Sequence, residues 1–390
     1  MNFIIPSPHY PENFKNFAYR LADRGVNVLG LGDEPYESLG EGLKNALTDY
    51  FRVLDLEDID EVKRAVAFLF YKYGPISGIE SNNEYWLPLD ASIRDQFNIP
   101  GLRPSDLEGL KYKSKMKDHF RKAGVPVIEG RLILEESDLR EAIGDLGLPL
   151  VAKPDNGVGA GGTFKLEDDE DVDNFLKVWD RSIEYFVEPY IEDGILCTYD
   201  GLIDLDGDII FETGLYHTIP TLELVRDKLD LAFIVKGSLE DKLIKYGRAI
   251  VEEFGMKGRF FHIEFFKRPN DEYVAIEYNN RVAGGYTIDV YNHCFGIDLY
   301  DIFARMVTGE KIEKIPASPN FALGLSQRSE YTYENYGPQI RESYGDRLKE
   351  EGPVPEAFRS IQGDYKYIIV TDNEDEIDHI VDFVHKHKEK

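Results

Sequence analysis

Apolar positions in the first hundred residues alternate between short continuous runs and helical spacing. The runs FIIP at 3–6, VNVLGL at 26–31 and ISGIES at 76–81 predict strands. Apolar residues that recur every three or four positions predict two amphipathic helices, one with Phe14, Phe17, Ala18 and Leu21 and one with Val62, Val66, Leu69 and Tyr73. This alternation predicts a parallel sheet covered by helices, a small Rossmann-like unit. No GxGxxG motif follows the first strand, so dinucleotide binding has no local support.

A basic helix is predicted next, in a protein whose formal net charge is −28. Its sequence KYKSKMKDHFRKAG, residues 111–124, ends at Gly124 and precedes Pro126, an ordinary helix stop. A solvated face is the usual explanation for such lysines, because lysine is mostly exposed. Ligand binding is the alternative, and the pattern alone leaves both open.

A glycine-rich loop follows the predicted strand LPLVAK, which ends at Lys153. The loop, PDNGVGAGGTF at 154–164, contains Gly157, Gly159, Gly161 and Gly162. Ordering so many glycines costs chain entropy, so such a loop is typical of a backbone that approaches a ligand closely. Its N–H groups beside a lysine suit phosphate oxygens, and a surface hairpin is the alternative.

Two hairpins are predicted after the strand and acidic turn YFVEPYIEDG, residues 185–194. The first hairpin, 202–212, turns at Asp206–Gly207, and the second, 260–280, turns around Asn270 and Asp271. If the second hairpin is symmetric about that turn, Glu264 lies directly opposite Glu277. Two facing carboxylates destabilise a sheet unless a proton or a cation lies between them.

Polar residues at alternate positions of the last strand add to this pair. Glu277, Asn279 and Arg281 are expected on one face, and Ile276 and Tyr278 on the other. Two carboxylates and an amide oxygen suit Mg²⁺, a hard ion that prefers oxygen ligands. The sequence therefore predicts a metal site at Glu264, Glu277 and Asn279, with Arg281 available to a developing anion.

Composition narrows the class of protein without identifying its chemistry. The net charge argues against binding to nucleic acid or an anionic membrane, and no stretch approaches the ~18 apolar residues of a membrane span. The two cysteines, Cys197 and Cys294, are far apart and predict buried thiols rather than a disulfide or zinc site. The N-terminus lacks a basic start and a long apolar run, so a soluble cytoplasmic protein is expected.

Other site chemistries fit the residues less well. No thiolate cluster supports a soft metal, and no GxSxG motif supports a serine hydrolase. Paired carboxylates also serve glycosidases, but that reading leaves the lysines and the glycine loop unexplained.

The order of these motifs resembles the ATP-grasp superfamily, specifically its carboxylate–amine ligase branch, related to biotin carboxylase and bacterial L-amino-acid ligases. The resemblance covers about residues 1 to 310, and the order and spacing of the motifs carry it. It implies that Lys113 and Lys153 bind nucleotide phosphates and that the 157–162 loop is a phosphate lid. The segment VEPYI is similar to the adenine hinge, which implies roles for Glu188 and for the backbone of Pro189 and Ile191. Glu264, Glu277 and Asn279 fall where the family holds two Mg²⁺, and ExNxR supplies Arg281.

Two departures from the family pattern bear on function. A ribose-binding carboxylate commonly follows the hinge in a GxE motif, where this chain has Leu196, so Glu192 or Asp193 would have to substitute. The distinctive biotin carboxylase stretch after its hinge is absent, and no biotinyl-carrier segment follows. The absence of this stretch and of a carrier segment argues against carboxylation of biotin.

The resemblance implies an α/β and α+β chain with the ATP-grasp fold. The expected parts are a Rossmann-like N-terminal domain (1–110), a small lid subdomain (111–195), a large subdomain with the Mg²⁺ and phosphate site (196–310) and a small C-terminal α/β lobe (311–390).

The implied activity joins a small carboxylate, an amino acid above all, to an amine, with ATP and Mg²⁺ or Mn²⁺ as cofactors. Lys153 and Arg281 are the expected catalytic residues. A bicarbonate- or formate-using relative of purine-pathway enzymes and a non-catalytic nucleotide-binding regulator are the alternatives.

The expected partners are the two small-molecule substrates, and a homodimer is compatible with them. Four further residues near the expected site in sequence are candidates for substrate contact: His217, Arg226, Tyr286 and Thr287. His262 shares the face of Glu264, where it either orients substrate or a metal-bound carboxylate or is an imidazole satisfied within the sheet.

Overall fold

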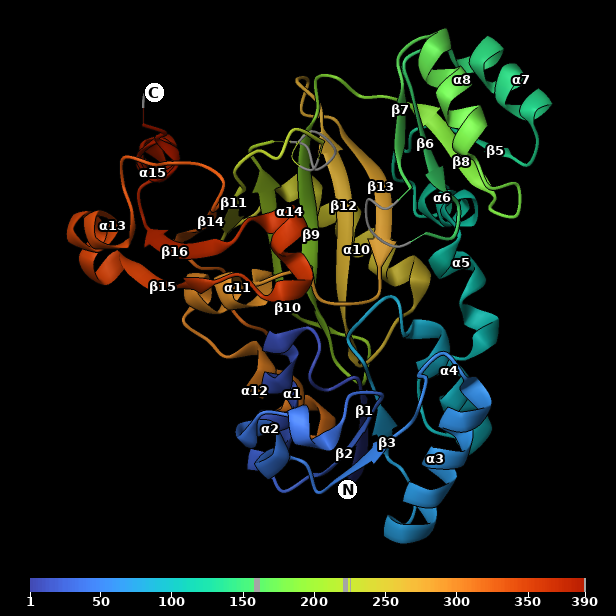
Figure 1. The fold of residues 1–390 in the computed structure, drawn as a ribbon, viewed down its shortest axis with the longest axis vertical. Helices are drawn as coiled ribbons and strands as arrows, with labels where there is room; N and C mark the ends of the chain where they lie inside the picture. The colour runs from blue at the N-terminus through green and yellow to red at the C-terminus, as the bar shows by residue number, and fades with distance from the viewer. Residues whose placement is uncertain (158–161, 220–223, 225, 389–390) are drawn as a thin grey trace.

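The computed structural model describes residues 1–157, 162–219, 224 and 226–388. Three sheets form the body of the molecule, and Figure 1 shows the N-terminal sheet below, the lid sheet at the upper right and the large central sheet between and to the left. This mixed α/β arrangement matches the expected fold class. Among the described helices, none is long and apolar enough to cross a bilayer.

The N-terminal sheet is parallel, with strand order β3-β2-β1-β4. Its strands are β1 (Asn2–Pro6), β2 (Asn27–Gly32), β3 (Asp49–Arg52) and β4 (Gly78–Ile79). The helices around it are α1 (Lys15–Asp23), α2 (Glu41–Ala46), α3 (Ile59–Tyr73) and α4 (Leu87–Phe97). The predicted apolar stripe is confirmed, because Phe17, Ala18 and Leu21 of α1 are buried.

The lid sheet is antiparallel, with order β5-β8-β6-β7. Its strands are β5 (Arg131–Ile133), β6 (Leu150–Pro154), β7 (Phe164–Leu166) and β8 (Tyr185–Pro189), and α7 (Glu136–Leu146) and α8 (Asp169–Val178) pack on it. The basic segment forms α5 (Glu108–Lys111) and α6 (Lys113–Lys122), and α6 contacts the central sheet at β13.

The central sheet has eight antiparallel strands in the order β13-β12-β9-β10-β11-β14-β16-β15. The strands are β9 (Ile195–Ile203), β10 (Ile209–His217), β11 (Ala232–Lys236), β12 (Arg259–Lys267), β13 (Tyr273–Asn279), β14 (Phe321–Gln327), β15 (Leu348–Pro353) and β16 (Tyr365–Thr371). Helix α10 (Asp241–Phe254) contacts β9, α11 (Thr287–Phe295) contacts β11, β14 and β16, and α12 (Leu299–Val307) contacts α1 and α11.

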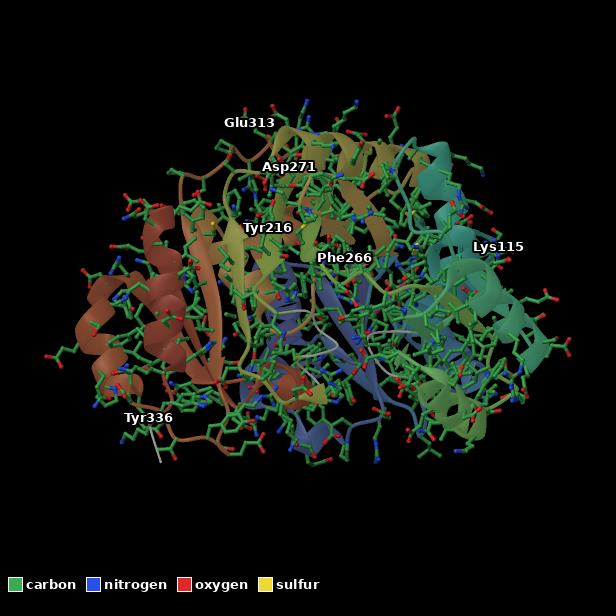
Figure 2. All side chains as sticks on the ribbon, turned by 90° about the horizontal axis from the view of Figure 1, so that it is seen from above. Lys115, Tyr216, Phe266, Asp271, Glu313 and Tyr336 are labelled. Atoms are coloured by element: carbon green, nitrogen blue, oxygen red, sulfur yellow. The ribbon has the colours of Figure 1, made fainter. Side chains whose placement is uncertain are left out.

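The C-terminal segment extends this same sheet with β14, β15 and β16. It also contains α13 (Gly337–Tyr344), α14 (Arg359–Gln362), α15 (Ile377–His385) and the short 3-10 helix η5 (Glu356–Phe358). Figure 2, seen from above, shows Tyr336 of this segment and Lys115 of α6 on opposite sides of the molecule, with Phe266 of β12 between them. The expected lobe at 311–390 thus shares its sheet with the large subdomain, and the exact domain boundaries stay a prediction.

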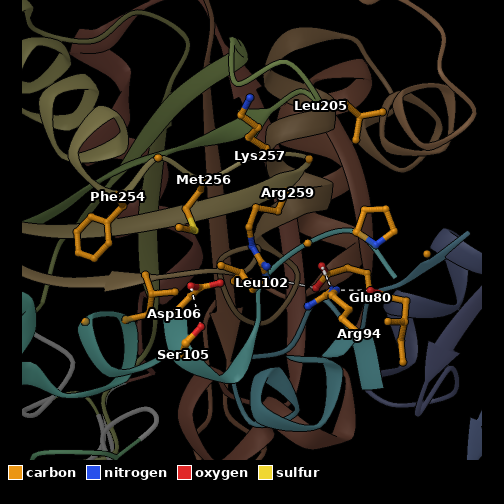
Figure 3. Close-up of a pocket in the computed structure, with 18 of the residues that line it drawn as sticks. Glu80, Arg94, Leu102, Ser105, Asp106, Leu205, Phe254, Met256, Lys257 and Arg259 are labelled. Atoms are coloured by element: carbon orange, nitrogen blue, oxygen red, sulfur yellow. Dashed lines mark hydrogen bonds and ion pairs between the residues drawn. The ribbon is translucent and has the colours of Figure 1, made fainter. Parts of the chain in front are cut away.

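A buried ion-pair network connects the N-terminal unit to the central sheet. Arg94 of α4 lies 3.0 Å from Glu80, and Arg259 of β12 lies 3.4 Å from the same carboxylate. The Arg259 guanidinium also donates to the Asn280 carbonyl at 2.7 Å. Figure 3 shows both arginines converging on Glu80 in a cavity of about 1210 Å³. These charges pair with one another, and they fix the backbone beside Arg281.

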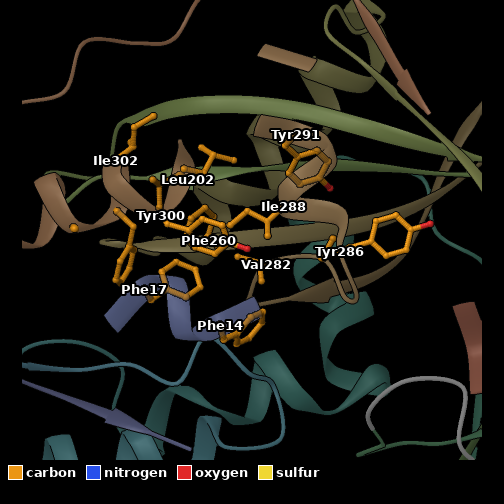
Figure 4. Close-up of a cluster of buried hydrophobic side chains, with 14 of the residues drawn as sticks. Phe14, Phe17, Leu202, Phe260, Val282, Tyr286, Ile288, Tyr291, Tyr300 and Ile302 are labelled. Atoms are coloured by element: carbon orange, nitrogen blue, oxygen red, sulfur yellow. The ribbon is translucent and has the colours of Figure 1, made fainter. Parts of the chain in front are cut away.

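An aromatic core lies on the other side of the same junction. Phe17 of α1 packs against Tyr300 of α12, with ring centroids 4.9 Å apart, and against Phe260 of β12 at 5.9 Å. Figure 4 shows these rings together with Val282 and Tyr286, which follow β13. Aromatic side chains bury large apolar areas, so this core holds the N-terminal unit firmly on the central sheet.

Candidate active site

A cavity of about 500 Å³ lies where the lid sheet meets the central sheet. Its described lining includes Lys113 and Lys153, the hinge residues Glu188, Pro189 and Ile191, the predicted metal residues Glu264, Glu277 and Asn279, and Arg281. These residues come from segments far apart in sequence, yet they line one space of the size that small-molecule sites have.

The hairpin of β12 and β13, the carboxylate hairpin, places Glu264 directly opposite Glu277, as predicted. The turn is not symmetric about Asn270 and Asp271, however. Lys267 pairs with Tyr273, which centres the turn on Asn270, and the register shifts by one residue between Glu264 and Phe265. The predicted register therefore holds only on the cavity side of that irregularity.

The extra residue in β13 is Ile276, and it corrects one expectation. Ile276 lines the cavity together with Glu277, whereas Tyr278 is buried in the core beneath the sheet. The predicted alternation, with Ile276 and Tyr278 on one face, fails because a bulge leaves two successive residues of one strand opposite a single partner. Glu277, Asn279 and Arg281 still share the cavity face.

Lys113 is held at the junction between α6 and the end of β6. Asp155 accepts from the Ser114 backbone N–H at 2.7 Å and from its hydroxyl at 2.7 Å, which caps the start of α6 from another segment. The Lys113 ammonium donates to the Gly157 carbonyl at 3.0 Å and lies 3.2 Å from Glu277. The basic helix is therefore not simply a solvated face, because Lys113 is 3% exposed.

Glu188 lies between two buried lysines. Lys153 is 2.5 Å from one carboxylate oxygen, and Lys117 is 3.0 Å from the other. Burial would raise the pKa of Glu188, but the two ammonium groups outweigh it and lower this pKa to about 2. Burial opposes the charge of Lys153, yet Glu188, Glu277 and Glu264 raise its pKa. Lys117 was missed from the sequence, although its i+4 spacing from Lys113 puts both on one helical face.

His262 connects Glu264 to a second buried carboxylate. Its Nε2 lies 3.3 Å from Glu264, and its Nδ1 lies 2.6 Å from Asp200 of β9. Tyr291 donates its hydroxyl proton to Asp200 at 2.7 Å, and Thr198 donates as well. Burial disfavours the charged imidazole, but Asp200 and Glu264 raise the pKa of His262 to about 9. Of the two readings of His262, the geometry favours the one in which it orients a carboxylate.

The donor set of the predicted metal site fits a hard cation. Glu264 and Glu277 supply carboxylate oxygens from adjacent strands, and Asn279 has no protein partner for its side-chain amide among the described residues. The part of the chain that the structure describes contains no cluster of three His, Cys, Asp or Glu residues arranged for a metal. An ion here would complete its shell with waters or phosphate oxygens, as Mg²⁺ ordinarily does.

The glycine loop and the hinge flank the lysines. Gly157 and Gly162 lie against Pro154, and Gly162 has a φ of +73°, whereas Gly159 and Gly161 lie outside the described residues. Pro189 and Ile191 line the cavity. Glu192 is exposed and is absent from the described lining, so its assignment to the nucleotide has no geometric support and stays a prediction.

The four candidate substrate residues separate into two groups. His217 and Thr287 line the cavity, and burial lowers the pKa of His217 to about 4. Tyr286 is fully buried and donates to the Leu325 carbonyl at 3.2 Å, which makes it a packing residue. Arg226 is exposed and pairs with Asp227 at 2.7 Å.

Residues from both ends of the chain also line the cavity and were missed from the sequence. Asn82 and Asn83 come from the loop after β4, and Phe358, Ile361 and Gln362 come from η5 and α14. Nothing in the local pattern of these segments signals a site, because only the packing of the N-terminal unit and of the C-terminal segment on the central sheet brings them to it.

No family model matches the chain. The curated alanine–anticapsin ligase of Bacillus subtilis strain 168 is 23% identical over 305 residues, which cover 73% of this chain and 62% of that protein. The crystal structure of an L-amino acid ligase from Bacillus licheniformis superposes with a TM-score of 0.72 at 17% identity and covers 97% of this chain and 95% of its own. The biotin carboxylase domain of the Hydrogenobacter thermophilus 2-oxoglutarate carboxylase, with MgADP and bicarbonate, also reaches 0.72 at 16% identity, covering 99% and 90%.

The chain has the ATP-grasp fold. Nearly the whole chain superposes on these structures, which confirms the expected fold. The chain spans less than two thirds of the length of the curated ligase that it matches.

Proposed function

We propose that this protein is an ATP-dependent carboxylate–amine ligase that forms a C–N bond and releases ADP and phosphate. The observation that carries the proposal is the convergence of two lysines and two facing carboxylates on one cavity between the lid and central sheets. Similarity to ligases named for amino-acid substrates supports an amino acid as the activated carboxylate.

The lysines and the glycine loop would bind the nucleotide. Lys113 and Lys153 are buried cations at the cavity wall, which suits phosphate oxygens. The four glycines of the loop would let the backbone approach these phosphates. They are Gly157, Gly159, Gly161 and Gly162. In this proposal Pro189 and Ile191 contact adenine, while Glu188 keeps Lys153 charged and in place.

Glu264, Glu277 and Asn279 would hold Mg²⁺, with Mn²⁺ as a substitute of the same ligand preference. When bound, the metal would neutralise charge on the β- and γ-phosphate oxygens. The protein contributes two carboxylates in fixed positions, because β12 and β13 are paired at this point and His262 holds Glu264.

The proposed chemistry has two balanced steps. A carboxylate oxygen attacks the γ-phosphorus of ATP, the bond to the bridging oxygen breaks, and ADP leaves with an acyl phosphate formed. The amine nitrogen then attacks the acyl carbon and loses a proton, and phosphate leaves. Arg281, which lines the cavity, would stabilise the oxyanion and the leaving phosphate, and closure of the glycine loop would limit hydrolysis of the acyl phosphate.

The deciding experiment measures ADP release with MgATP and a panel of carboxylate and amine pairs, followed by mass spectrometry of the products. Release that depends on both substrates, with an amide product, is the expected result. Incorporation of labelled bicarbonate instead would indicate a carboxylase. If MgATP raises the thermal midpoint by ligand linkage but no pair releases ADP, the protein is a nucleotide-binding regulator and the ligase proposal is wrong.

A further inference from the structure

The cavity continues past Arg281 into a space walled by apolar side chains, here called the apolar chamber. Its members come from the short 3-10 helix η1 (Glu12–Phe14), from β10, β11 and the segment before β11, from the turn after β13 and from the C-terminal segment. The chamber residues are Phe14, Leu215, Leu224, Leu231, Phe233, Val282, Ala283, Phe358 and Ile361. All nine belong to or pack against one hydrophobic cluster, so they form a continuous wall.

None of the nine chamber residues is charged, and the charged groups of the cavity belong to the rest of its described lining. Among the described lining residues, Lys, Arg, Asp and Glu occur only as Lys113, Lys153, Glu188, Glu264, Glu277 and Arg281. The polar residues that accompany the chamber are His217, Thr287 and Gln362. A charged side chain placed in this chamber would lose its hydration without gaining an ionic partner from the described wall, which is strongly unfavourable.

One wall of the chamber is a short segment from the C-terminal part of the chain, residues 356–362, here called the strap. Two buried side chains hold it: the Ser326 hydroxyl donates to the Gln362 carbonyl, and Arg328 donates to the Ile361 carbonyl at 2.9 Å and to the Leu229 carbonyl at 2.9 Å. Leu229 is two residues from Leu231, which is part of the opposite wall. Arg328 therefore links the strap to the segment before β11, which also contributes to the chamber.

The strap also touches the turn that follows Arg281. The Gln362 amide packs so closely on Gly285 that a Cβ at position 285 would lie 1.9 Å from the Gln362 Oε1. Asn13 donates to the Gly285 carbonyl at 2.9 Å from the other side. Phe358 and Ile361 of the strap are only half-buried, so they have apolar surface left for a ligand to cover.

We propose that the apolar chamber holds the side chain of the carboxylate substrate, which is a carboxylic acid with a bulky, uncharged, branched or aromatic side chain. Phe358 and Ile361 are its specificity-determining residues. The inference rests on the proposed ligase function. Arg281 takes the carboxylate end, and the chamber begins at the next two residues, Val282 and Ala283, so the side chain of the same molecule extends into the chamber.

The test compares kcat/KM for ADP release across alanine, leucine, phenylalanine, glutamate and lysine as carboxylate substrates, with one amine held constant. Leucine or phenylalanine is expected to exceed glutamate and lysine in kcat/KM by about 100-fold, because a charged side chain in the chamber loses its hydration without gaining an ionic partner. A preference for glutamate or lysine overturns the inference and leaves the ligase function intact.

Variants of the strap locate the effect. Phe358→Ala and Ile361→Ala are expected to lower kcat/KM for leucine and phenylalanine by about 10-fold or more. The kcat/KM for alanine should stay within about 3-fold of the wild-type value. Ile361→Lys is expected to raise the ratio of glutamate to leucine turnover by about 10-fold. Leu134→Ala, at a leucine that is 53% exposed and outside the cavity lining, is the matched control.

Two readouts separate a failed inference from a failed fold or function. Each variant is checked for an unchanged thermal shift by MgATP, which a misfolded protein would not show. If Phe358→Ala and Ile361→Ala lose the same fraction of kcat/KM for every carboxylate while they still bind MgATP, the specificity role is contradicted. Absence of ADP release with all carboxylates in the wild-type protein contradicts the ligase function itself.

Discussion

Glu264 on β12 lies directly opposite Glu277 on β13, and each carboxylate has its own cation, His262 for Glu264 and Lys113 for Glu277. These cations compensate the facing negative charges in the structure. They also leave the remaining oxygens of both carboxylates available to a divalent ion between the strands.

Replacement of Glu277 by alanine is expected to lower the rate of ADP release at least about 100-fold, because the metal loses one of its two carboxylates. The fold should remain, since Glu277 is partly exposed at the cavity surface. The measurement is ADP release at saturating MgATP, with circular dichroism as the check on folding. Glu272→Gln on the same hairpin, outside the cavity lining, is the control, and full turnover in Glu277→Ala would remove Glu277 from the metal site.

Replacement of Glu188 by glutamine is expected to destabilise the protein by about 3–5 kcal/mol at pH 7, because the buried Lys117 and Lys153 both lose the carboxylate with which they form an ion pair. Urea unfolding measures the difference. Glu136→Gln, at an exposed carboxylate of α7, is the control and should change stability by less than about 0.5 kcal/mol. An equally small change in Glu188→Gln would show that the lysines do not depend on it.

The same pair predicts a pH dependence of stability. The folded-state pKa of Glu188 is lowered to about 2 from an ordinary value near 4.5, so its contribution is fully present above about pH 4.5. This contribution is lost as the pH falls toward 2. By linkage, the free energy of unfolding that depends on it is about 3 kcal/mol. The difference in unfolding free energy between the wild-type protein and Glu188→Gln should therefore shrink from pH 6 to pH 3. A constant difference across that range would contradict the lowered pKa.

Asp200 is expected to act as a positioning residue through His262. Asp200→Asn weakens the hold on the imidazole that contacts Glu264, so activity should fall by about 10- to 100-fold. The distinguishing readout is the Mg²⁺ concentration that gives half-maximal rate, which should rise several-fold. A purely structural defect would lower the rate and leave this Mg²⁺ concentration unchanged. Asp208→Asn, in the exposed β9–β10 turn, is the control.

The carboxylate hairpin shows how far the sequence could predict the site. The prediction of Glu264 opposite Glu277 is correct, yet the assumed turn is centred half a residue too far along the chain, and the bulge at Ile276 cancels that error. A bulge depends on how a strand packs on its neighbours and leaves little local signal. The face of Ile276 was therefore predicted wrongly while the carboxylate pair was predicted correctly.

Residues that reach the site through tertiary packing were missed for a different reason. Lys117 and Asp200 act only because α6 packs on β13 and because β9 pairs with β12 beside His262. The strap arrives through β14 and β16, which extend the central sheet from a segment to which the motif order assigns no role. Motifs concentrated in one segment were readable from the sequence, whereas contacts between segments required the fold.

Gly285 provides a test of the contact between the strap and the turn after Arg281. It has a φ of +72°, and a Cβ there would collide with the Gln362 amide. Gly285→Ala should therefore destabilise the protein by at least about 1–2 kcal/mol from the left-handed conformation alone and lower ADP release by moving the Gln362 amide and the turn that follows Arg281. Gly284→Ala is a matched control, because its Cβ would lie at an ordinary 3.6 Å from Phe358 and its φ is not positive.

The double variant Gly285→Ala with Gln362→Ala separates the steric contact from backbone strain. Removing the Gln362 amide relieves the collision but not the left-handed conformation, so the double variant should regain part of the stability and activity that Gly285→Ala loses. Urea unfolding and ADP release of the four proteins in the cycle measure this coupling. Strict additivity would show that Gln362 does not press on Gly285, and the contact of the strap with this turn would then rest on Phe358, which lies beside Gly284.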